Sequence, residues 1–109
     1  MTTKREILEE AMEVVDGRGK SYGRPEDNFQ RIARLWNAHL ENRMMVDTAG
    51  NKVLAEMITP QDVAMMMALM KIARLENDSS HHDSWVDIAG YAACGGELAD
   101  TWNKGERAA

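Results

Sequence analysis

The stretch that most restricts the fold is "TPQDVAMMMALMKI", residues 59–72. Thr59 is a favourable N-cap, Pro60 suits the first helical position, and Asp62 completes a T-x-x-D pattern that resembles a capping box. Residues 63–72 are apolar almost all the way round a helix, so little of this segment suits contact with water. The sequence therefore predicts a central, buried helix against which other helices pack.

Three further helical segments are indicated by apolar residues at helical spacing. The first covers about residues 4–16 and is expected to end at Gly17, followed by a Gly-rich turn that reaches Gly23. The second covers about residues 25–40 and begins with a proline. The last covers about residues 83–102 and contains "AGYAACGG", whose small residues let a neighbouring backbone come close.

The helical periodicity fails between the second and third helices, over about residues 41–58. This segment has a polar centre with Gly50-Asn51 between short apolar runs, which fits either a small hairpin or a mobile loop. Residues 103–109 are expected to fray. We therefore predict an all-α fold, a four-helix bundle that forms a single domain over residues 1–109.

The amino-acid composition restricts the classes of partner that this protein is expected to bind. The net charge of −5 and the pI near 5.1 argue against broad DNA binding, which needs a basic face. No signal peptide is recognisable, and the longest apolar stretch, residues 63–70, is far too short for a membrane span. With a single cysteine, Cys94, a reducing cytosol is the expected compartment. We expect a cytoplasmic protein, in a bacterium or a phage-infected host, with no nucleic acid or membrane partner.

The nine methionines are unevenly placed, and most lie between residues 44 and 70. Methionine fills irregular gaps in helical cores and also suits adaptable interfaces, so both explanations stay open. A chain this small with so apolar a central helix is expected to be a homo-oligomer, a dimer or a tetramer.

Gly19-Lys20-Ser21 has the form of the end of a phosphate-binding P-loop, but the rest of that motif is missing. Val14 stands where the first glycine should be, and a helix precedes the turn where a strand should. Lys20 and Tyr22 nevertheless place a cation and a phenol on a Gly-flanked segment. They either clamp a phosphate and stack on a base, or belong to a solvated turn between helices.

The clearest chemical pattern lies in "HHDSWVDIAGY", residues 81–91. Asp83, Asp87 and Tyr91 follow an i, i+4, i+8 spacing and share one helix face. Two ionised carboxylates one turn apart repel each other, and Mg²⁺, with Mn²⁺ as a second choice, removes that conflict. The alternative is structural, because Asp83 or a neighbouring serine also suits the start of a helix.

His81 has three open roles, as a general base, an orienting hydrogen-bond partner or an exposed turn residue. Zinc is disfavoured because no CxxC or HExxH partner exists. Lys71 and Arg74 are i, i+3 neighbours that could together meet a polyphosphate, or could neutralise the end of their helix. Asp62 serves as a cap and is a candidate third metal ligand.

A family resemblance rests on three stretches: "KSYG…NF" in residues 20–29, "TPQDVAMMMALMKIAR" and "HxDSWVDIAGYAA". Together they cover roughly residues 18–98. They resemble a family of small phage and prophage proteins of uncharacterised function. More remotely, the chain is similar to the MazG-like, all-α nucleoside triphosphate pyrophosphohydrolases and to related nucleotide-modification-associated domains.

In those pyrophosphohydrolases an E-x-x-E pair and an E-x-x-D pair hold Mg²⁺ against the triphosphate, and the subunits form dimers or tetramers. Here Asp87 matches the final carboxylate, while Ser84 stands in place of its acidic partner. The central helix has no E-x-x-E pair and offers only Asp62 in its place, and the pairs with that spacing, Glu6-x-x-Glu9 and Glu10-x-x-Glu13, lie on the first helix.

The resemblance implies a metal-dependent nucleotide pyrophosphohydrolase. Asp83, Asp87 and Asp62 would then hold the metal, and His81 would take a proton from water. From their own charge and ring chemistry, the residues that we expect to bind the substrate are Lys20, Tyr22, Lys71, Arg74 and Tyr91. Two alternatives remain: a non-catalytic module that binds and sequesters a nucleotide, and a helical protein-protein interaction protein.

Overall fold

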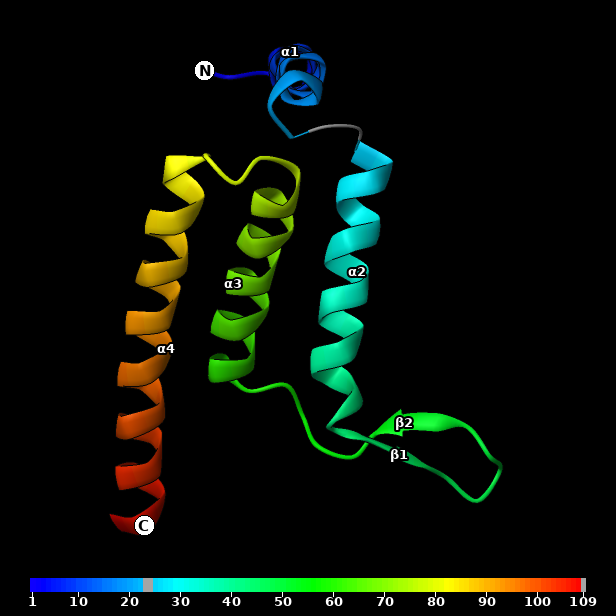
Figure 1. The fold of residues 1–109 in the computed structure, drawn as a ribbon, viewed down its shortest axis with the longest axis vertical. Helices are drawn as coiled ribbons and strands as arrows, with labels where there is room; N and C mark the ends of the chain where they lie inside the picture. Colours follow the sequence, from blue (N-terminus) through cyan, green and yellow to red (C-terminus); the bar gives the residue numbers. More distant parts are fainter. Residues whose placement is uncertain (23–24, 109) are drawn as a thin grey trace.

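A computed structural model describes the backbone of residues 1–22 and 25–108, and the side chains of residues 1–17 and 27–100. Four helices and one small hairpin follow one another along the chain (Figure 1): α1 Lys4–Tyr22, α2 Pro25–Glu41, β1 Met44–Val46, β2 Lys52–Leu54, α3 Pro60–Asn77 and α4 His82–Ala108. The predicted all-α, four-helix fold is confirmed.

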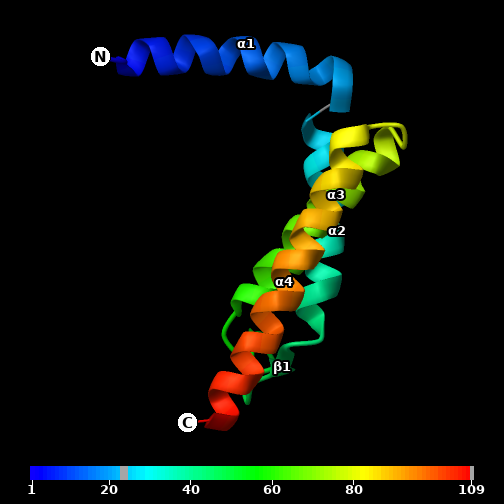
Figure 2. The same cartoon turned by 90° about the vertical axis from the view of Figure 1, so that its left-hand side faces the viewer.

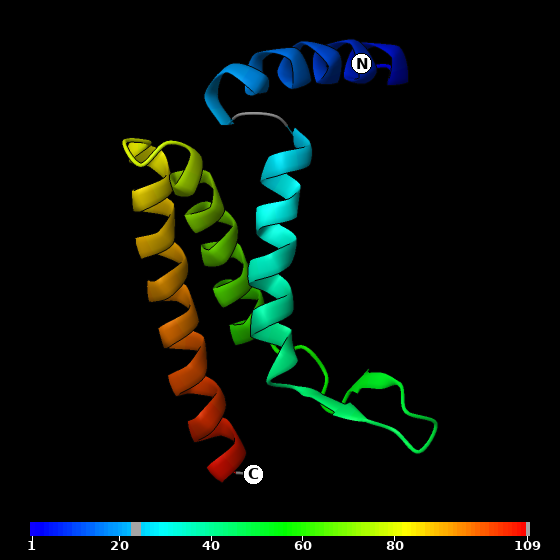
Figure 3. The ribbon, with the colours of Figure 1, turned by 45° about the vertical axis from the view of Figure 1, so that its right-hand side comes forward.

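Helices α2, α3 and α4 lie side by side in one layer, with α3 in the middle (Figures 1 and 2). The Trp36 indole N–H of α2 donates to the main-chain oxygen of Met66 in α3, at 2.6 Å. On the other side, α4 runs antiparallel to α3 and packs closely on it. Helix α1 lies crosswise at one end of this layer and contacts α2 only sparsely (Figure 3).

The start of α3 agrees with the sequence in detail. Thr59 has extended backbone angles, its hydroxyl accepts from the main-chain N–H of Asp62, and the Asp62 carboxylate accepts from the N–H of Thr59. This reciprocal pair is a capping box that satisfies two otherwise unpaired donors, and Pro60 supplies the first helical residue. The local sequence therefore determines where the central helix begins.

The segment between α2 and α3 is a hairpin, which settles the alternative that the sequence leaves open. Strands β1 and β2 are antiparallel, and Met45 is the partner of Val53. Their loop is held by the Asp47 carboxylate, which accepts from the main-chain N–H groups of Ala49 and Asn51. Gly50 has a φ of +85°, a conformation that favours glycine and allows this tight turn.

The predicted end of the first helix at Gly17 is wrong, because α1 continues to Tyr22 and takes in residues 18–22 of the expected Gly-rich turn. Glycine costs about 1 kcal/mol in a helix interior, which weakens a helix without forbidding it. A Cβ placed at Gly17 would meet no atom within 4 Å. At the other end of the chain, α4 continues past Trp102 to Ala108.

The expectation that α3 is central is confirmed, but its apolar residues are only partly covered. Val63 and Met65 keep 51% and 45% of their surface exposed. Among the described side chains, the buried hydrophobic residues are Ala73 and Leu75. A single layer leaves both of its faces open, and this explains why an almost wholly apolar helix is not enclosed. Within the described residues, no helix is both long and apolar enough to cross a membrane.

Candidate functional site

An ion pair joins the two helices that carry most of the predicted site. The ammonium nitrogen of Lys71 in α3 lies 2.9 Å from Oδ2 of Asp87 in α4. The Lys71 side chain is 12% exposed and that of Asp87 is 43% exposed, so a largely buried cation meets a carboxylate that water still reaches. A pair of this kind is screened less than a surface ion pair. The predicted repulsion between Asp83 and Asp87 is therefore offset by a lysine within the chain.

The positions of the remaining charged residues of the predicted site follow from the same helix register. Arg74 lies one turn beyond Lys71 and is half-buried, and Asp83 is exposed in the first turn of α4. Since α3 and α4 are antiparallel and Lys71 meets Asp87, the level of Arg74 along the axis corresponds to the start of α4. The structure thus brings two cations and two carboxylates to one end of the helix pair.

His81 stands in the turn just before α4 and is held by the helix that follows it. Its Nδ1 lies 2.7 Å from the hydroxyl of Ser84, and the main-chain N–H of Ser84 donates to the His81 carbonyl oxygen. Ser84 is completely buried. Because its hydroxyl is enclosed, Ser84 orients the imidazole and is itself closed to substrate. His81 is therefore held at the start of α4, the end of the helix that also carries Asp83.

Asp62 lies in a separate network at the other end of α3. Its carboxylate is fully buried and accepts from the N–H and hydroxyl of Thr59 at 2.8 and 2.9 Å. It also meets His39 Nε2 at 3.0 Å and Arg43 Nη2 at 3.1 Å. Nine residues, or about 13 Å of helix, separate Asp62 from Lys71.

The ionised form of Asp62 is stabilised by these partners. Burial by itself opposes ionisation, but the hydrogen bonds from Thr59 and His39 and the charge of Arg43 outweigh it, so the pKa of Asp62 is below its usual value. A carboxylate can only accept hydrogen bonds, so His39 Nε2 carries the hydrogen in this contact. The sequence does not point to His39, in α2, or to Arg43, in the turn after it, because neither belongs to a motif that relates it to the start of α3.

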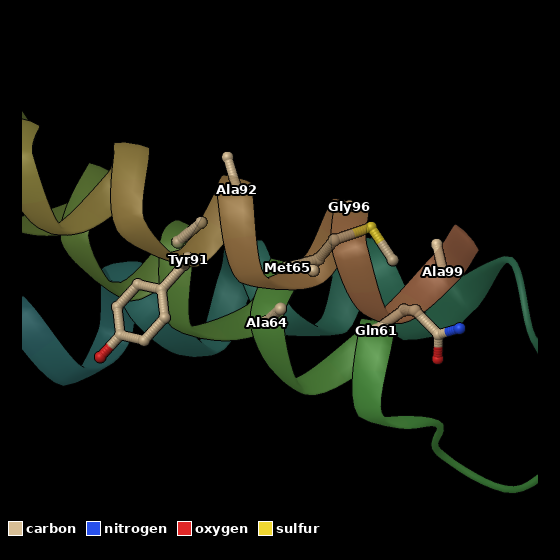
Figure 4. A pocket seen from close by; sticks show the side chains of 9 residues that line it. Gln61, Ala64, Met65, Tyr91, Ala92, Gly96 and Ala99 are labelled. Carbon is tan, nitrogen blue, oxygen red and sulfur yellow. The ribbon is translucent and has the colours of Figure 1, made fainter. Parts of the chain in front are cut away.

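Tyr91 lines an apolar groove between α3 and α4, one turn along from Asp87 (Figure 4). The groove has a volume of about 320 Å³. Its lining residues are Gln61, Ala64, Met65, Ala68, Tyr91, Ala92, Gly95, Gly96 and Ala99. Lys71 and Asp87 are absent from this lining, so the phenol and the ion pair occupy neighbouring places along the helix pair and do not share one cavity.

Two parts of the predicted site need separate mention. The side chains of Lys20 and Tyr22 lie outside the described residues, as do residues 23–24. Within the described residues, no group of three or more His, Cys, Asp or Glu side chains is arranged to hold a metal ion. The donors that would suit Mg²⁺ are Asp83 and Asp87, which are accessible and one turn apart. Asp62 does not fit such a site, since four donors already surround its carboxylate.

The fold and this cluster define a small all-α protein with a charged site at one end of an antiparallel helix pair. The chain belongs to the family described as Domain of unknown function (DUF6378), which matches residues 6–99. It is 43% identical over 89 residues to the Gene 55 protein of Mycobacterium phage D29, and 41% identical over 87 residues to that of Mycobacterium phage L5.

These alignments cover 81% and 79% of this chain but 50% and 47% of the phage proteins. The chain therefore spans about half the length of these relatives. The expected membership of an uncharacterised phage family is confirmed. No solved structure matches the chain at a significant level.

Proposed function

We propose that this protein binds a nucleoside triphosphate, or a related phosphorylated nucleotide, together with Mg²⁺ or Mn²⁺, and hydrolyses it to a monophosphate and pyrophosphate. The proposed site lies at the charged end of the α3–α4 pair. The observation that carries the proposal is the Lys71–Asp87 contact, which holds an ammonium group beside a partly exposed carboxylate. A cation for phosphate and a carboxylate for a metal are the two groups that a bound triphosphate requires.

The residues divide into roles according to their charge. Asp83 and Asp87 would hold the metal ion, which when bound would neutralise phosphate charge and polarise the phosphorus centre. Lys71 and Arg74 offset the remaining negative charge of the phosphates. Because both cations come from one α3 turn, they face the same part of the substrate. Asp62 is left out of the metal site because of its own network.

In the proposed reaction, water attacks the α-phosphorus, the bond to the bridging oxygen of the β-phosphate breaks, and pyrophosphate leaves. The proton released by the water passes to His81, whose ring is oriented by Ser84. Tyr91, and the predicted contacts Lys20 and Tyr22, are assigned to the base or sugar. The protein is expected to act in the host cytosol as a homo-oligomer.

A second candidate is a module with the same site that binds the nucleotide without turnover. Because Asp62 is engaged elsewhere, one carboxylate pair, Asp83 and Asp87, remains at the proposed site within the described residues. A single pair is enough to bind a metal-nucleotide complex, whereas hydrolysis in the resembling enzymes uses two. Binding without pyrophosphate release distinguishes this candidate from the enzyme.

The test is a pyrophosphate-release assay. Purified protein is incubated with Mg²⁺ or Mn²⁺ and each of a panel of nucleoside triphosphates, and released pyrophosphate is measured. Asp83→Asn should abolish release, because it removes a metal ligand from an exposed position without breaking the Lys71–Asp87 pair. Glu97→Gln, the matched loss of one negative charge on the same helix, should not affect it. Equal turnover in wild type and Asp83→Asn would refute the proposed metal site.

A further inference from the structure

Helix α1 carries an apolar stripe that the other described residues leave exposed. Ile7, Leu8, Met12 and Val15 follow a spacing of one helix face, and each is 57% to 66% exposed. The opposite face is acidic, with Glu6, Glu9, Glu13 and Asp16. A helix of this pattern is expected to bury its stripe against another element. Here α1 projects from the end of the helix layer, away from α3 and α4 (Figure 2).

The dimensions of the chain show how much surface is left uncovered. Its radius of gyration is 17.9 Å, whereas a compact domain of this length has about 13 Å. Its accessible surface is 8451 Å², and a compact monomer of this mass exposes roughly 6,000 Å², which leaves an excess of roughly 2,400 Å². Stable interfaces bury about 800 Å² on each partner, and obligate homodimers bury more. One obligate subunit interface would therefore bury about as much surface as this excess.

The groove between α3 and α4 is lined by small side chains that would let a helix come close. Its walls are mostly Ala and Gly, with Met65 nearly half exposed, so another backbone can approach closely without displacing large side chains (Figure 4). A Cβ placed at Gly96 would meet no atom within 4 Å, so this part of the groove is open. The groove and the α1 stripe are thus complementary in their apolar character, and one chain supplies both.

We propose that α1 of one copy lies in the α3–α4 groove of a second copy, so that two chains exchange their first helices. Such an exchange is closed and symmetric, since each copy gives one α1 and receives one. It covers the apolar stripe and the open part of the groove at the same time. This proposal is independent of the nucleotide proposal and stands whether or not the protein binds a nucleotide.

Two pairs of substitutions test the α1 side of this contact. Leu8→Gln with Val15→Gln introduces two amides on the stripe, two turns apart. Glu6→Gln with Glu13→Gln introduces the same amides, with the same separation, on the acidic face. By sedimentation equilibrium, the wild type and the acidic-face variant should be dimers at micromolar concentration. The dissociation constant of the stripe variant should be higher than that of the wild type by roughly 100-fold or more. A monomeric wild type, or equal dissociation of both variants, would overturn the proposal.

A mixing experiment tests which surface receives α1, and its conclusion does not rest on the behaviour of a single variant. The groove variant, Met65→Gln with Gly96→Gln, should also be monomeric, with its helix content checked by circular dichroism. An equimolar mixture of the stripe and groove variants should regain a dimer. In that mixture, the intact α1 of the groove variant meets the intact groove of the stripe variant. A mixture that stays monomeric would contradict the exchange, because α1–α1 pairing and simple misfolding both predict no recovery.

Discussion

Gly95 of α4 lies against Ala64 of α3 so closely that a Cβ added at Gly95 would be 2.9 Å from the Ala64 Cβ. This distance is shorter than real Cβ contacts allow, so the two helices approach as they do because position 95 is glycine. The Ala- and Gly-rich face that the sequence shows in α4 is thereby explained as a helix contact. It also determines the register that brings Lys71 to Asp87, about two turns further along the pair.

The first prediction concerns this contact. Gly95→Ala should force the helices apart and cost about 1–3 kcal/mol through overpacking, which outweighs the gain of about 1 kcal/mol from better helix propensity. Gly90→Ala is the matched control, because a Cβ at Gly90 meets nothing within 4 Å and should stabilise the protein. Urea unfolding of both variants measures the difference. Equal stabilisation by the two substitutions would show that the close contact is absent.

The second prediction concerns two carboxylates that share Arg43. Asp62→Ala removes a fully buried partner of Arg43 and His39 as well as one half of the capping box of α3, and should cost about 3–5 kcal/mol. Glu56→Ala removes the exposed partner of the same arginine, which should change the free energy of unfolding by less than about 1 kcal/mol. Thermal unfolding of the two variants compares them directly. Similar losses of stability in both variants would mean that Asp62 does not form the buried contacts with Arg43 and His39.

The third prediction follows from the lowered pKa of Asp62. The folded state binds a proton at Asp62 less readily than the unfolded state, so this group contributes its full stabilisation above the unfolded pKa, near 3.8. That stabilisation is lost as the pH falls below that value and through the pKa of the folded state. The test is to measure the free energy of unfolding from pH 6 downward over about three pH units. This free energy should fall more steeply with decreasing pH in wild type than in Asp62→Asn. Parallel curves for the two proteins would oppose this assignment.

The fourth prediction concerns the strength of the Lys71–Asp87 pair. Asp87→Ala leaves a largely buried ammonium without its carboxylate, so it should cost more than the double variant Lys71→Met with Asp87→Ala. A double-mutant cycle on unfolding free energy should give a coupling of about 0.5–3 kcal/mol. A coupling indistinguishable from zero would mean that solvent screens the pair and that it does not join α3 to α4.

Local sequence predicted the parts of the fold whose signals are local. The Thr59–Asp62 box and Pro60 determine the start of α3, and the structure confirms both. Gly17 was misleading, because a glycine in a helix costs little enough for the neighbouring residues to carry the helix on to Tyr22. The exposure of Val63 was not predictable from one chain, since an apolar residue has the same sequence signal whether it faces its own core or another subunit.

The candidate site, like the fold, depends partly on spacing along one helix and partly on contacts between helices. The spacing of Asp83 and Asp87 placed both on one face of α4, as helical geometry requires. Lys71 was named from its charge, but its contact with Asp87 depends on the helix register, which Gly95 and Ala64 set. No spacing rule along the sequence encodes such a contact between two helices.

The central claim is that the charged end of the α3–α4 pair binds a metal-nucleotide complex. Calorimetric titration with non-hydrolysable nucleoside triphosphates, with Mg²⁺ present and absent, tests this claim most directly in wild type, Asp83→Asn and Glu97→Gln. We predict Mg²⁺-dependent binding in wild type and Glu97→Gln, weakened at least about 10-fold in Asp83→Asn, which corresponds to about 1.4 kcal/mol. Nucleotide binding that is equal in all three proteins, or absent from folded wild type throughout the panel, would contradict the account.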